Sequence, residues 1–132
     1  MRYLLIAIAF ILFSCKQSAI SKQLSGSDSL VLQFNHPQSN MIAKTVTTTE
    51  TSAIRRLAQF VDGKGSTLFK CGYDGNMIFF SKGEQKGDIS FQYSIDSCRH
   101  FVFDMDGELK AARMNNEAAD FLKSLAEGRN AY

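Results

Sequence analysis

Three cysteines and two histidines are the residues of this chain best suited to catalysis or metal binding. Cys98 and His100 would share one face of a strand, and Cys71 could join them as a further ligand or as a disulfide partner. A thiolate beside an imidazole can bind zinc, or act as a nucleophile with its base. However, the sequence contains no C-x-x-C motif and no closely spaced histidine pair. We therefore predict a structural disulfide between Cys71 and Cys98, with a metal or redox site and two free thiols as the alternatives.

The remaining acidic and glycine-containing motifs predict turns rather than sites. Residues 104–108 alternate acidic side chains like calcium ligands, but the other residues of a calcium-binding hand are missing. Asp106-Gly107 is typical of a hairpin turn, and so is Asp74-Gly75. The sequence has no glycine-rich phosphate loop and no serine-nucleophile motif. We expect no catalytic residue, no metal and no cofactor.

The N-terminus has the pattern of an export signal that ends in a lipidation motif. Arg2 precedes an apolar run over residues 3–13, which is too short to span a membrane and has the length of a signal-peptide core. The following motif, Leu12-Phe13-Ser14-Cys15, resembles the lipobox of bacterial lipoproteins. This resemblance implies cleavage after residue 14 and acylation of Cys15. An ordinary signal peptide with a chance cysteine is the alternative.

The signal divides the chain into four expected segments. Residues 1–14 are the signal peptide, residues 15–27 the lipidated cysteine and a flexible polar tether, residues 28–127 one domain, and residues 128–132 a loose tail. Lys16 is not the Asp that retains lipoproteins in the inner membrane of well-studied Gram-negative bacteria. The expected location is therefore the cell envelope, as an outer-membrane lipoprotein that faces the periplasm or the surface.

The charge balance argues against a nucleic-acid partner. The chain has 15 basic and 13 acidic residues, and loss of residues 1–14 removes only Arg2 among them. A chain so close to neutral lacks the excess of basic over acidic residues that is typical of nucleic-acid binders. We expect the lipid, rather than a basic patch, to hold the protein on the membrane.

Hydrophobic periodicity predicts the order β-β-α-β-β-β-β-β-α. Strands are expected over residues 29–34, 41–48, 67–71, 76–81, 88–94, 99–104 and 108–113. One amphipathic helix should begin at a cap on Thr49 or Thr51 and end at a left-handed Gly63, and a second should run from Asn115 or Asn116 to Gly128. Tight turns between strands indicate a mostly antiparallel sheet with both helices packed on it, which is the α+β class.

One set of motifs resembles small uncharacterised lipoproteins of Bacteroidota-type bacteria. The set comprises the lipobox, Cys71-Gly72-Tyr73-Asp74-Gly75, Ile78-Phe79-Phe80, Phe91, Cys98 and Phe101-Val102-Phe103. The resemblance implies a matched cysteine pair and an envelope location, and it implies no catalytic residue. A fainter likeness, to lipid-anchored lysozyme inhibitors, rests on a cysteine beside an aromatic-rich strand.

These features predict a non-enzymatic, lipid-anchored envelope domain with a binding or structural role, whose partner would be a protein or another envelope component. One alternative is an inhibitor of an extracellular hydrolase, which would insert residues 35–40 or 82–87 into the enzyme. Another is a binder of a small apolar ligand, held between the sheet and the helices.

Overall fold

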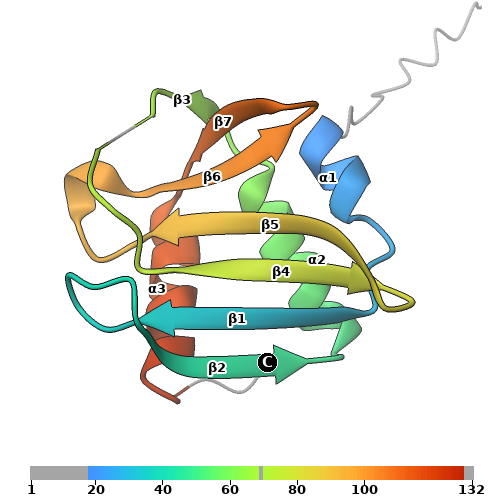
Figure 1. The fold of residues 1–132 in the computed structure, drawn as a ribbon, viewed down its shortest axis with the longest axis horizontal. Helices are drawn as coiled ribbons and strands as arrows, with labels where there is room; N and C mark the ends of the chain where they lie inside the picture. Colours follow the sequence, from blue (N-terminus) through green and yellow to red (C-terminus); the bar gives the residue numbers. More distant parts are fainter. Residues whose placement is uncertain (1–17, 69, 130–132) are drawn as a thin grey trace, which may run out of the picture.

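The computed structural model describes residues 18–68 and 70–129. Within these residues, seven strands form one antiparallel sheet in the order β2-β1-β4-β5-β6-β7-β3 (Figure 1). The strands are β1 (Ser29–Asn35), β2 (Ile42–Thr48), β3 (Gly65–Ser66), β4 (Gly75–Ser81), β5 (Glu84–Gln92), β6 (His100–Met105) and β7 (Glu108–Arg113). The helices are α1 (Ala19–Leu24), α2 (Thr51–Val61) and α3 (Asn116–Ala126), with a short 3-10 turn η1 (Asp96–Cys98). The α+β class and the predicted order of strands and long helices are confirmed.

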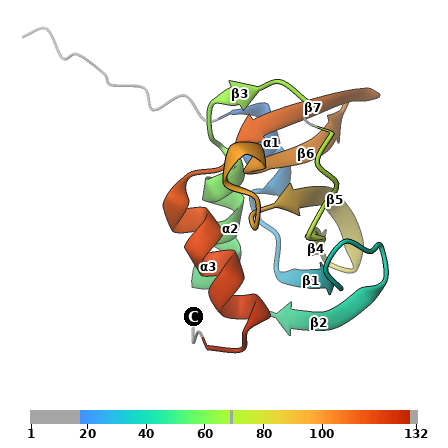
Figure 2. The same cartoon turned by 90° about the vertical axis from the view of Figure 1, so that its left-hand side faces the viewer.

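Helices α2 and α3 cover one face of the sheet (Figure 2). Each helix presents an apolar stripe at helical spacing, so burying that stripe against the sheet removes it from water. The stripes meet the inward residues of the central strands, and Phe79, Phe91 and Phe101 are fully buried there. The stripe residues are Ile54, Leu57, Ala58 and Val61 from α2, and Ala118, Phe121, Leu122 and Leu125 from α3.

The prediction of a flexible tether is wrong for Ala19–Leu24, because these residues form α1. Two side chains one helical turn apart, Ile20 and Leu24, are 5% and 1% exposed and belong to the core. Ser18 caps the helix, because its hydroxyl accepts a hydrogen bond from the Ser21 amide at 3.2 Å. The Gln23 amide also donates to the Lys86 carbonyl of β5 at 2.8 Å. The folded domain therefore includes α1, which the sequence analysis placed in the tether.

Two strands differ from their predicted bounds by more than one residue. The strand expected over residues 67–71 is replaced by the two-residue β3, which pairs with Ala111 and Ala112 of β7. Strand β5 begins at Glu84 because the preceding turn is only Lys82-Gly83, both with positive φ. The turn predicted at Asp106-Gly107 is confirmed, with φ values of 56° and 80°. The Asp104 carboxylate accepts from the Gly107 amide at 2.9 Å in that turn, so it serves the hairpin.

The helix ends are partly as predicted. Asn115 caps α3 by accepting from the Ala118 amide at 2.8 Å, and Gly128 is left-handed at φ 67°. In contrast, α2 begins after Glu50 without a side-chain cap, so the predicted threonine caps are wrong. Gly63 does not have positive φ either. A Cβ there would lie 2.7 Å from the Arg113 carbonyl oxygen, so close backbone approach accounts for this glycine.

Candidate functional site

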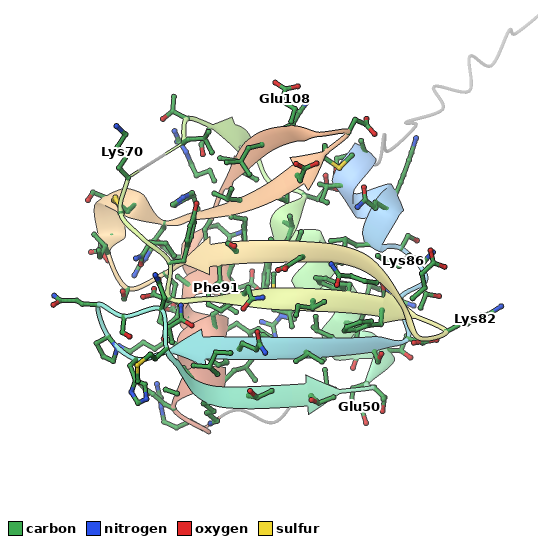
Figure 3. All side chains as sticks on the ribbon, viewed as in Figure 1. Glu50, Lys70, Lys82, Lys86, Phe91 and Glu108 are labelled. Atoms are coloured by element: carbon green, nitrogen blue, oxygen red, sulfur yellow. A yellow bond between two sulfur atoms is a disulfide. The ribbon has the colours of Figure 1, made fainter. Side chains whose placement is uncertain are left out.

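Three connecting segments gather at one end of the sheet (Figure 1). They are residues 36–41 between β1 and β2, residues 70–74 before β4, and residues 93–99 between β5 and β6. Antiparallel neighbours place alternate connections at the same end of a sheet, which brings these three together. We call this region the loop end. The turn that bears Lys82 lies at the opposite end of the sheet (Figure 3).

The predicted disulfide between Cys71 and Cys98 is confirmed, with 6.2 Å between the two Cα atoms. It joins two segments of the loop end that are 27 residues apart in sequence. Because the two sulfur atoms are bonded to each other, neither offers a thiolate for nucleophilic or metal chemistry. The sulfurs therefore act here as a crosslink of the loop end.

Asp74 holds the same segments by hydrogen bonds. Its carboxylate accepts from the amides of Tyr93 and Ser94, both at 2.8 Å, and from the Ser94 hydroxyl at 2.9 Å. Its backbone pairs on one side with Phe91 and on the other with Asn35. The turn predicted at Asp74-Gly75 is therefore wrong, because Asp74 leads straight into β4.

Gln92 is a loop-end residue that sequence analysis missed. It is only 3% exposed, and its carbonyl oxygen accepts from the Ser94 amide at 2.9 Å and the Ile95 amide at 3.2 Å. Its amide nitrogen donates to the Cys71 carbonyl at 3.5 Å. One buried amide thus satisfies backbone groups of two segments, which favours a single conformation of the loop end.

His100 lies beneath this network rather than in an accessible site. The imidazole is fully buried, its Nδ1 contacts the Cys98 carbonyl, and its ring lies 6.1 Å from that of Tyr73. Residues 70–74 cross the face of the sheet opposite to α2 and α3 at this point (Figure 2). Cys98 belongs to η1 rather than to β6, so the expected shared strand face of Cys98 and His100 is not formed.

A cleft of about 630 Å³ opens at the loop end. Its lining combines Pro37, Gln38, Ser39 and Asn40 with Tyr73, Asp74, Ser94 and Ile95, among others. Two exposed apolar side chains line it, Tyr73 and Ile95, which are 39% and 44% exposed. Met41 and Ile42, which directly follow the lining segment in the sequence, are 69% and 51% exposed. Such clustering of exposed apolar side chains is typical of interaction sites.

Tyr93 predicts that the stability of the domain depends on pH in the alkaline range. Burial, with the nearby Asp74 and Glu127 carboxylates, raises the pKa of the Tyr93 phenol above its ordinary value. The folded state thus favours the neutral phenol. The contribution of this preference to the free energy of unfolding is fully present below about pH 10, and it is lost as the pH rises through the raised pKa. We expect the free energy of unfolding to fall less steeply between about pH 9 and 11 in Tyr93→Phe than in the wild type. Denaturant titrations at several pH values measure this, and equal slopes would contradict it.

The predicted lipidation site, Cys15, lies outside the described residues, and so does the expected signal peptide, residues 1–14. None of the helices in residues 18–68 and 70–129 has the length and hydrophobicity that a membrane-spanning helix requires. Comparisons with known proteins found no relative of this chain. No family model, no curated protein and no solved structure matches it.

Proposed function

We propose that the chain is a non-enzymatic binding domain of the bacterial cell envelope, anchored by a lipid on Cys15, that presents its loop end to a protein partner. The observation that carries this proposal is the cleft at the loop end, whose lining includes the exposed apolar side chains of Tyr73 and Ile95. The exposed Met41 directly follows the lining segment in the sequence. The lipobox supplies the location, and the disulfide suits an oxidising compartment.

The loop end has properties that favour a protein ligand. Exposed aromatic and aliphatic side chains act as anchors in protein interfaces when a partner buries them. The disulfide, Asp74 and Gln92 hold the segments in place before binding. Arg99 adds a further link, donating to the Tyr93 carbonyl and to the Asn116 side chain, both at 3.0 Å. Such preorganisation reduces the entropy lost on association.

The chemistry of the loop end supports binding rather than catalysis. Nucleophilic catalysis needs an activated nucleophile with a base that reaches the substrate. Here both cysteines are oxidised, and His100 is fully buried. Both oxygens of Asp74 accept hydrogen bonds from the loop that it holds. The cysteines and His100, which the sequence analysis singled out as the residues best suited to catalysis, thus have structural roles at the loop end.

Photocrosslinking in the cells that produce the protein tests this function. A benzophenone amino acid would replace Met41 or Ile95, and a control would carry it at Asp120, on the exposed face of α3. We expect one dominant envelope protein to be captured from positions 41 and 95 and not from position 120. Capture of the same proteins from all three positions, or of none, would contradict a partner at the loop end.

A second candidate is inhibition of an extracellular hydrolase through residues 36–40. This loop is closed by hydrogen bonds from the His36 amide to the Met41 carbonyl at 2.8 Å and from the Ser39 amide to the His36 carbonyl at 3.1 Å. An ordered projecting loop can enter an enzyme cleft. Residues 82–87 are less suitable, because they form a two-residue turn and the start of β5. Assays against a panel of lysozymes and proteases, with Asn40→Ala as a loop variant, separate this candidate from other binding roles.

A further inference from the structure

Helix α1 fixes where the N-terminal chain enters the domain. Ile20 and Leu24 are buried in the core, and Gln23 is hydrogen-bonded to β5. Leu24 packs directly over Gly87, where an added Cβ would come within 2.6 Å of its methyl group. The helix cap at Ser18 is therefore a fixed point on the surface of the domain rather than part of a tether.

That entry point lies beside the β6–β7 turn. Ser18 and Ala19 line a cavity of about 280 Å³ together with Met105, Asp106 and Lys110. Figure 1 shows the start of α1 next to the tip of the β6–β7 hairpin, at the end of the sheet away from residues 36–41. We call the region formed by Ser18, Ala19 and residues 105–110 the anchor end.

The sequence leaves little chain between this point and the proposed lipid. Only Lys16 and Gln17 separate Cys15 from Ser18, so the link reaches at most about 10 Å. The polar layer on each side of a bilayer is about 5–8 Å thick, as the difference between total and hydrocarbon thickness requires. An acyl chain on Cys15 begins at the inner boundary of that layer. Even a fully extended link would then leave Ser18 no more than about 5 Å beyond the headgroup layer, so the anchor end would lie beside the lipid headgroups.

The surface of the anchor end suits such a contact. Leu109, beside the hairpin turn, is 54% exposed, and the cavity at this end is lined by the apolar side chains of Ile20, Phe103 and Met105. The anchor end carries charges of both signs, because Lys110 is close in sequence to Asp106 and Glu108. Glu108 projects outward from the hairpin (Figure 3). This balance gives no preference for anionic lipid, so the short link, rather than charge, would impose the contact.

We propose that the anchor end is a bilayer-contacting surface, which orients the domain with its loop end away from the membrane. This inference rests on the proposed acylation of Cys15. The strands that separate the two ends, such as the seven-residue β4, are about 20 Å long. The cleft would then face partners in the aqueous space rather than the membrane that carries the protein.

Site-specific fluorescence quenching in vesicles tests the orientation. The acylated full-length protein would be reconstituted into phosphatidylcholine vesicles that contain a lipid with a spin-labelled headgroup. A fluorophore would be attached to Leu109→Cys at the anchor end or to Asn40→Cys at the loop end, both exposed positions. We expect loss of fluorescence at position 109 and none above background at position 40. Equal quenching at both positions would overturn the orientation.

A linker variant separates orientation from mere anchoring. Inserting twelve Gly and Ser residues between Gln17 and Ser18 adds a flexible span of about 20 Å and leaves the domain and lipid unchanged. We expect quenching at position 109 to fall to the level at position 40, and unchanged quenching would contradict a contact imposed by the short link. The intact mass of the membrane-bound protein reports acylation separately. Absence of the lipid would overturn both the anchor and this inference, whereas an acylated protein with uniform quenching would overturn the orientation alone.

Discussion

Gly75→Ala should destabilise the domain by about 3 kcal/mol or more, since overpacking of this kind forces the backbone to move. Gly75 begins β4 between β1 and β5, opposite Phe34 and Phe91. An added Cβ would lie 2.0 Å from the Gln33 carbonyl oxygen and 2.8 Å from the Phe91 ring. The first of these groups is backbone within a paired strand, so it cannot turn away as a flexible side chain would. Urea unfolding measures the loss.

Gly65→Ala is the matched control. Gly65 is also a strand residue, in β3, and a Cβ there meets nothing within 4 Å. Alanine restricts the unfolded chain more than glycine, so this variant should be neutral or stabilised by up to about 1 kcal/mol. Similar unfolding free energies for the two alanine variants would show that the close approach at Gly75 is not as described.

Removal of the disulfide by the double substitution Cys71→Ser and Cys98→Ser should cost about 3–4 kcal/mol. The crosslink closes a 27-residue loop, which restricts the unfolded chain in the chain-entropy model. For a domain of this size, that loss corresponds to a fall in Tm of roughly 10–15 °C. Thermal unfolding followed by circular dichroism measures it.

Reducing agent separates the crosslink from the side effects of the serines. It should lower the Tm of the wild type to near that of the double variant and leave the variant unchanged. The variant should also lose most photocrosslinking from Ile95, because the disulfide holds the segment that carries this residue. An unchanged Tm on reduction would contradict a structural role for the bond.

The main elements could be predicted because their signals are local. Ile54, Leu57 and Val61 recur at helical spacing, and Ile89 and Phe91 alternate at strand spacing. Periodicity alone indicates which face each element buries, so the fold class and the order of the strands and helices could be predicted from it. Helix α1 escaped notice because a six-residue segment with two buried apolar residues has too few turns to show a period.

The loop end was only partly predictable. The cysteine pairing followed from elimination, because the sequence analysis assigned Cys15 to the predicted lipobox and two cysteines remained. Gln92 and Asp74 gave no comparable signal, since each acts through backbone groups of a different segment. Asp74 bonds to residues about 20 positions away, and an Asp-Gly pair resembles a turn wherever it occurs.

The sequence by itself determined the α+β architecture and the disulfide partners, because hydrophobic period and cysteine number are properties of the chain. The tertiary structure decided which connections share an end of the sheet, that Asp74 and Gln92 hold them, and that α1 begins four residues after Cys15. It also decided why Gly75 must be glycine. These outcomes depend on hydrogen bonds and close approaches between distant segments, and such contacts exist only once the strands are paired.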